Sequence, residues 1–224
     1  MYRLCLLFIS LSGSAFGQAN GHLEPDDSVF TYGWSLDYYS NVVRVLGRVL
    51  PERSPKVLVL PSNLNEYVIG INDEEGGCLI VSGRVTHTLW LYESRKDNSD
   101  IDEYMKNSDF PEDPLDVAVD LSDQPASPDF CRRVRDVWAT TLLRTRYPDP
   151  DSVRVGADGV SFHFSTWQRG RGILSGKTWS PEGQTIPGKL VALSMSLRSY
   201  SRSGIGDDLE ALDEALTEIE SALQ

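Results

Sequence analysis

Short apolar runs separated by turn-forming residues constrain this chain most, because each run has the length of a β-strand. The acidic and glycine-rich segment 73–77 separates two of them, as the loop of a β-hairpin would. We therefore expect mostly antiparallel pairing. The runs predict about seven strands, over 56–60, 66–72, 78–82, 85–92, 152–155, 160–167 and 173–179, with a short additional strand over 115–121.

Segments with helical periodicity lie between and after the strands. Ser127 and Pro128 suit the N-cap and first turn of a long helix. Asp207 and Glu210 have the spacing of a capping box at the start of the last helix. This order predicts a single α+β domain with three to four helices packed on one side of the sheet. The expected helices cover 35–50, 128–146, 189–200 and 207–223.

The first 19 residues have the pattern of a secretory signal peptide. Arg3 makes the start positive, residues 4–16 are mostly apolar, and the small residues around Gly17 suit a signal peptidase. The apolar stretch is shorter than the roughly 20 residues of a spanning helix, and no longer one follows. We expect a mature domain of residues 20–224, periplasmic or secreted, with no membrane span. The absence of an Asn-x-Ser/Thr sequon favours a bacterial source. Residues 18–27 are polar and expected to be loose.

Two of the three cysteines remain after removal of the signal peptide, namely Cys78 and Cys131. In an oxidising compartment an even pair is most simply a disulfide. The alternative is two separately buried thiols, because the sequence does not show whether the two Cα atoms lie close together.

Acidic residues outnumber basic ones by 33 to 21, which gives a formal net charge of −12, or −13 after Arg3 leaves with the signal peptide. Eleven acidic residues against one basic residue lie between 97 and 129, which predicts an exposed, partly irregular loop. A second acidic block forms the expected helix 207–223. Such a surface repels the phosphates of nucleic acids and attracts a basic protein.

No motif in the sequence assigns an enzymatic activity. The segment Gly176-Lys177-Thr178 resembles the end of a phosphate-binding loop, but Arg171 stands where that motif requires glycine. The three histidines lie in separate segments without the spacing of metal ligands. We therefore expect no cofactor and no metal site, and we assign no catalytic residue.

Two groups of residues are candidates for binding. Trp167, Arg169 and Arg171 lie at the expected hairpin turn 168–172, where they could meet an anionic partner or stack on a sugar ring. The alternative is a solvated turn. Asp207, Asp208 and Glu210 begin the last helix and could meet a basic partner.

Two further patterns have a structural and a functional interpretation. His163 and Ser165 share one face of an expected strand, which allows a hydrolytic pair but is more typical of a polar strand face. The last helix carries a narrow apolar seam that suits packing on the domain itself or, second, weak self-association. The seam consists of Leu209, Leu212, Leu216, Ile219 and Leu223.

Several segments of the C-terminal third resemble small exported proteobacterial proteins of no assigned activity. They are Val160-Ser-Phe-His-Phe-Ser, Gly176-Lys-Thr-Trp-Ser-Pro and Gly188-Lys-Leu-Val-Ala-Leu. The resemblance implies a bacterial, exported protein and no catalytic residue.

The sequence therefore leaves two hypotheses of different classes. The first is a non-enzymatic envelope protein that binds a basic protein, as an inhibitor or an immunity-type partner does. The second is an envelope hydrolase whose active site is built from scattered residues that include His163 and Ser165.

Overall fold

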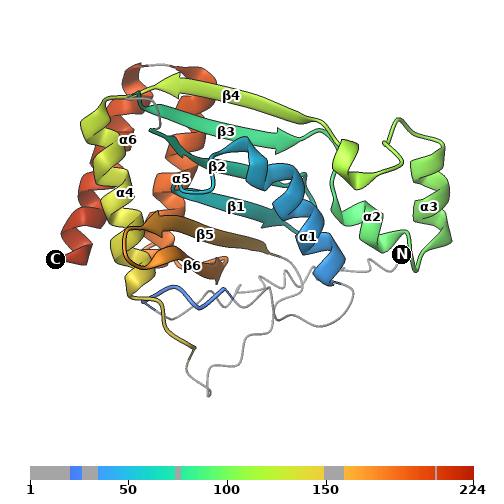
Figure 1. The fold of residues 1–224 in the computed structure, drawn as a ribbon, viewed down its shortest axis with the longest axis horizontal. Helices are drawn as coiled ribbons and strands as arrows, with labels where there is room; N and C mark the ends of the chain where they lie inside the picture. Colours follow the sequence, from blue (N-terminus) through green and yellow to red (C-terminus); the bar gives the residue numbers. More distant parts are fainter. Residues whose placement is uncertain (1–20, 27–34, 74–76, 149–158, 205) are drawn as a thin grey trace, which may run out of the picture.

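The computed structural model describes residues 21–26, 35–73, 77–148, 159–204 and 206–224. Its centre is one antiparallel sheet in the order β4-β3-β2-β1-β5-β6 (Figure 1). The strands are β1 (Lys56–Pro61), β2 (Tyr67–Asn72), β3 (Leu79–Val85), β4 (Val119–Pro125), β5 (Val160–Gln168) and β6 (Gly172–Trp179). The helices are α1 (Ser35–Leu46), α2 (Trp90–Ser94), α3 (Ser99–Lys106), α4 (Pro128–Leu143), α5 (Ile186–Ser203) and α6 (Gly206–Leu223).

Three helices, α4, α5 and α6, form a layer over one face of the sheet (Figure 1). Alternate residues of β5 point into this layer, and Phe164 meets Trp138 of α4 with ring centroids 5.6 Å apart. Both side chains are fully buried. Burial of one such large apolar side chain stabilises the fold by about 1.5–3 kcal/mol. The residues between this layer and the sheet form the larger of the two clusters of buried apolar side chains.

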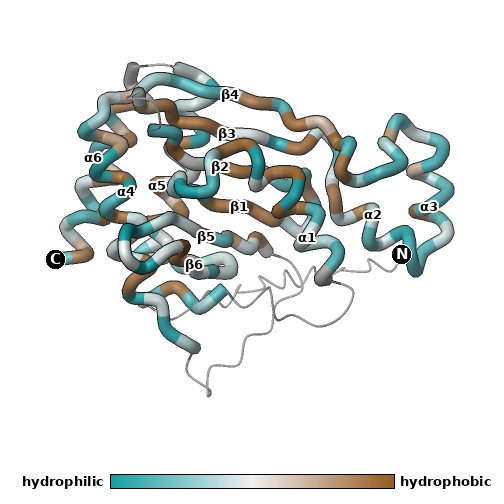
Figure 2. Tube along the Cα trace, viewed as in Figure 1, coloured by the Kyte–Doolittle hydropathy of each residue, from teal (hydrophilic) through white to brown (hydrophobic). Residues whose placement is uncertain are grey.

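The other face of the sheet is covered as well, so the expectation of helices on one side only is wrong. Leu58 and Leu60 of β1 pack there with Val42 and Leu46 of α1. Four consecutive residues of β1 are buried, which is typical of a strand covered on both faces. The apolar colour along β1 in Figure 2 reflects this continuous pattern.

The described residues contain six strands rather than about seven, and six α-helices rather than three to four. The expected strand over 85–92 is wrong, because β3 ends at Val85 and the chain turns into α2. The buried carboxylate of Glu66 accepts the backbone N–H groups of Leu89 and Trp90. This contact fixes the start of a helix where the residue alternation alone indicates a strand. The expected strand over 152–155 lies outside the described residues.

The acidic segment 97–129 is only partly a loop. It contains α3, whose N-cap Asn98 accepts N–H groups of Asp100 and Ile101. It also contains β4, which forms one edge of the sheet. A short 3-10 helix, Pro114–Asp116, delays the start of that strand relative to the expected range 115–121. Some of the acidic residues therefore lie on regular elements, and others, such as Asp109 and Glu112, lie in the connecting turns.

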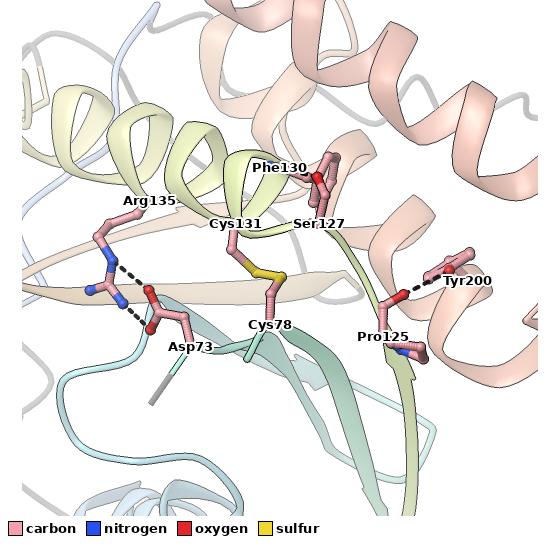
Figure 3. Close-up of a disulfide and its surroundings, with 8 residues drawn as sticks. All are labelled: Asp73, Cys78, Pro125, Ser127, Phe130, Cys131, Arg135 and Tyr200. Atoms are coloured by element: carbon pink, nitrogen blue, oxygen red, sulfur yellow. Dashed lines mark hydrogen bonds and ion pairs between the residues drawn. A yellow bond between two sulfur atoms is a disulfide. The ribbon is translucent and has the colours of Figure 1, made fainter. Parts of the chain in front are cut away.

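The disulfide between Cys78 and Cys131 is present, with the two Cα atoms 6.2 Å apart (Figure 3). It joins the start of β3 to the first turns of α4. On the same helix Arg135 forms an ion pair with Asp73, from the end of β2. These contacts fix the N-terminal half of α4 to the sheet.

No helix within the described ranges has the length and apolar content needed to cross a membrane. The expected signal peptide, residues 1–19, lies outside those ranges.

Candidate functional site

A groove of about 590 Å³ lies between the first turns of α4 and the N-terminal half of α6. Its lining includes Phe130, which is buried, and Leu209, which is 38% exposed. Ser127 caps α4 by accepting the N–H of Phe130, 3.1 Å away, and thereby sets one wall. The groove therefore has one apolar lining residue from each helix. Four carboxylates line it, those of Asp129, Glu210, Asp213 and Glu214, together with Arg133.

The charges in this groove are not balanced. Asp129 pairs with Arg132 at 2.5 Å, and Asp213 pairs with Arg133. Neither Glu210 nor Glu214 has a cationic partner within the part of the chain that the structure describes. The two carboxylates lie four residues apart on α6, where like charges repel each other. A cation bound between them would relieve this repulsion.

Arg133 is held in place on the wall of the groove. It donates hydrogen bonds to Glu220 at 2.7 and 2.9 Å and to Thr217 at 3.1 Å, and it also pairs with Asp213. The hydrogen bonds to Glu220 are the main reason that the pKa of the guanidinium is raised; burial opposes this change, and the hydrogen bond to Asp213 adds to it. Arg133 therefore stays charged and joins α4 to α6, which gives the groove a fixed width.

The acidic residues predicted at the start of the last helix are brought only partly into this groove. Glu210 lines it. Asp207 and Asp208 lie in the first turn of α6, but their side chains are outside the described part of the structure. The sequence missed Asp129 and Arg133, since only the folded chain places the start of α4 beside α6.

The apolar seam of α6 packs into the domain's own core. Leu212, Leu216 and Ile219 are each 0% exposed and belong to the cluster beneath α4 and α5. Leu223 is 8% exposed, so Leu209, at 38%, is the one residue of the seam with a substantial exposed fraction. The structure therefore gives no support to self-association through this seam.

The predicted hairpin turn is present between β5 and β6. Gly170 and Gly172 adopt φ values of +82° and +83°, which L-residues with a side chain rarely adopt. Arg169 and Arg171 are exposed at the turn. Trp167 is partly buried, and the guanidinium of Arg53 lies 4.8 Å from the centre of its ring. The guanidinium of Arg53 therefore covers one face of the Trp167 ring, and a sugar could not stack on that face.

His163 lies in the middle of β5 and is 9% exposed. Its Nδ1 lies 3.1 Å from Oδ2 of Asp26, and its ring packs on Tyr39 with centroids 4.7 Å apart. Nδ1 can donate a hydrogen bond to this carboxylate, which orients the ring. Ser165 shares the strand face but makes no hydrogen bond with His163.

Asp26 reaches His163 because the preceding residues are anchored. Glu24 forms an isolated bridge with Lys177 of β6, through backbone hydrogen bonds of 2.9 and 2.7 Å. Leu23 is fully buried in the larger core. The expectation that residues 18–27 are loose is therefore wrong for 21–26. No pattern in the sequence indicates that Asp26 contacts His163.

Glu66 is another buried carboxylate, with 0% exposure. It accepts hydrogen bonds from Tyr38, Thr88, Leu89 and Trp90 at 3.0–3.2 Å. Burial, and then the charge of Glu66, raise the pKa of the Tyr38 hydroxyl. Tyr38 lies on α1, and Leu89 and Trp90 lie at the start of α2, so the Glu66 carboxylate links these two helices.

Comparison of the chain with protein-family models, with curated proteins and with solved structures gives no match. No group of three or more His, Cys, Asp or Glu side chains within the described ranges could hold a metal ion. The resemblance to exported proteobacterial proteins stays a prediction.

Proposed function

We propose that this protein is an exported binding protein whose acidic groove between α4 and α6 captures a basic segment of another protein. The observation that carries the proposal is the groove itself, which is lined by four carboxylates and two apolar side chains. A basic side chain with an aliphatic stem suits both features, because the stem can lie on Leu209 and Phe130 while its charge meets Glu210 or Glu214.

The charge of the whole chain supports capture of a basic partner. A net charge of −12 gives the protein a negative field, which accelerates association with a positive surface and makes it sensitive to salt. An inhibitor or immunity-type protein for a basic toxin or hydrolase of the bacterial envelope fits this description. The disulfide fits an oxidising compartment, and the N-terminal pattern fits export to one.

The role of the groove in binding is tested by replacing its two unpaired carboxylates with lysine, which reverses their charge. We expect the Glu210→Lys/Glu214→Lys variant to weaken binding of the basic partner about tenfold or more, because attraction at the groove becomes repulsion. The partner is first isolated from envelope extract on immobilised wild-type protein at low salt. The dissociation constants are then measured with purified components at two salt concentrations.

The matched control is Glu52→Lys/Glu182→Lys, which makes the same change in net charge at two exposed residues outside the groove. We expect its dissociation constant to stay within about twofold of the wild-type value at moderate salt. Equal weakening by both variants would show that only the overall charge matters, and that result would remove the groove from the proposal.

A hydrolase is the second candidate, and the buried His163–Asp26 pair favours it. A histidine oriented by a carboxylate can act as a general base toward a water molecule. If this is the function, His163→Ala is expected to lower hydrolysis of cell-wall or ester substrates by about 100-fold or more. His87→Ala is the control, because His87 has a surface carboxylate partner, Asp109, at 3.3 Å. No turnover by the wild type, or equal rates in both variants, would exclude this candidate.

A further inference from the structure

Three arginines gather near the C-terminal end of α5 in an otherwise acidic protein. Arg198 and Arg202 lie one helical turn apart on α5, and Arg84 lies on β3. Arg84 is directly paired with Tyr67 of β2, and the guanidinium of Arg198 lies 4.2 Å from the centre of the Tyr67 ring. The sheet and the helix therefore bring the three cations to one surface.

None of these arginines forms an ion pair with a residue whose side chain the structure describes. Asp120 of β4 is paired in register with Arg84, but their charged groups are not within the 4.0 Å of an ion pair. Among the side chains that the structure describes, no carboxylate forms an ion pair with any of the three guanidiniums. Burial lowers the pKa of Arg198, and the charges of Arg202 and Arg84 lower it further, while Tyr67 opposes the change. The cations repel each other in the unliganded protein.

A shortage of acidic partners does not explain this arrangement. The chain has 33 acidic residues against 21 Lys and Arg residues, and Arg132, Arg133 and Arg135 of α4 all pair with carboxylates. The negative end of the α5 dipole stabilises a cation in its last turn, which accounts for Arg202 alone. Arg84 on the sheet and Arg198, oriented on an aromatic ring, need another explanation.

A cavity of about 430 Å³ lies beside these residues, lined by Met195, Arg198, Ser199, Arg202 and Ser203. This volume is in the range of small-molecule sites. Its polar lining consists of guanidinium donors and serine hydroxyls. Guanidinium groups bind phosphate oxygens in pairs, with a geometry that ammonium groups do not reproduce.

We propose that Arg84, Arg198 and Arg202 form an anion site that binds a phosphate group. The phosphate belongs either to a soluble phosphate ester or to the headgroup of an anionic lipid, and the site recognises the same chemistry in both. Binding would replace the repulsion among the three cations by attraction to a shared anion. This proposal is independent of the acidic groove, because the two sites have no residue in common.

The first test is a titration of the ¹⁵N-labelled protein with inorganic phosphate, with chloride at equal ionic strength as the reference. We expect saturable shifts of the amide signals of 195–203. In Arg84→Ala/Arg202→Ala, the affinity is expected to fall about tenfold or more. This variant keeps the contact between Arg198 and Tyr67. The control Arg44→Ala/Arg146→Ala removes the same charge at two exposed residues outside the site and is expected to change the affinity less than about twofold.

Three results would overturn the site. The first is the absence of a saturable response up to about 10 mM phosphate. The second is an equal loss of phosphate affinity in both double variants. The third is a marked loss of stability of Arg84→Ala/Arg202→Ala in the absence of phosphate. The last result would give the arginines a structural role.

A second experiment identifies whether the phosphate belongs to a lipid headgroup or to a soluble ester. The protein is sedimented with phosphatidylglycerol vesicles and with phosphatidylcholine vesicles. Binding to the former alone, displaced by free phosphate, assigns the site to a lipid headgroup. Phosphate binding without vesicle binding assigns it to a soluble ester. Vesicle binding that the Arg84→Ala/Arg202→Ala variant does not weaken would contradict the proposal.

Discussion

Loss of the Cys78–Cys131 disulfide is expected to lower the free energy of unfolding by about 4 kcal/mol, the chain-entropy value for a closed loop of this length. The bridge joins residues 53 positions apart, so its absence restores much of the freedom of the unfolded chain. Urea unfolding of the wild type with and without a thiol reductant measures the difference. For a domain of this size the thermal midpoint falls by roughly 8–16 °C.

The control for this measurement is Cys78→Ala/Cys131→Ala, which is expected to be insensitive to the reductant. Its midpoint should lie close to that of the reduced wild type, and slightly below it because two buried sulfur atoms are removed. A wild-type midpoint that does not respond to the reductant would contradict a structural disulfide.

Glu66→Ala is expected to cost about 3–5 kcal/mol of stability, because it leaves more than one buried donor without this acceptor, at about 1–3 kcal/mol for each. The Tyr38 hydroxyl and the N–H of Leu89 lose a buried acceptor, while the N–H of Trp90 keeps a hydrogen bond to Oγ1 of Thr88. The effect is measured by urea unfolding. Hydrogen exchange at the amides of Leu89 and Trp90 is expected to accelerate more than exchange in β5.

Two variants sharpen the Glu66 experiment. Glu66→Gln keeps the shape and one acceptor oxygen, so its cost is expected to be smaller, about 1–3 kcal/mol. Glu52→Ala removes an exposed carboxylate and is expected to change stability by less than about 0.5 kcal/mol. If Glu66→Ala and Glu52→Ala had the same small effect, Glu66 would not be the residue that fixes α2 to the sheet.

The regular centre of the fold could be predicted from the sequence. The expected strands 56–60 and 160–167 match β1 and β5 within one residue at each end, because each is an apolar run of strand length. Helix α4 begins at Pro128 as expected, since Ser127 accepts the N–H of Phe130. The disulfide could be expected from an even number of cysteines in an exported chain.

The remaining features depend on contacts between distant segments, which a local pattern does not encode. Helix α2 begins where Glu66, 23 residues earlier, accepts the N–H of Leu89. His163 is oriented by Asp26, 137 residues earlier, in a segment without periodicity. The acidic groove forms only because α4 lies beside α6 in the folded chain. The sequence predicted an acidic binding surface at Glu210, but not that the start of α4 completes it.

The order of the strands has a consequence for folding during synthesis. β1 pairs with β2 at once, but its other neighbour, β5, follows more than 90 residues later. Until the C-terminal third is made, the most apolar strand of the sheet therefore has an open edge, and such edges pair with other chains. The long separation also predicts slow folding. A holdase that covers β1 until β5 arrives is expected to raise the yield of folded protein more than any change at the finished surface.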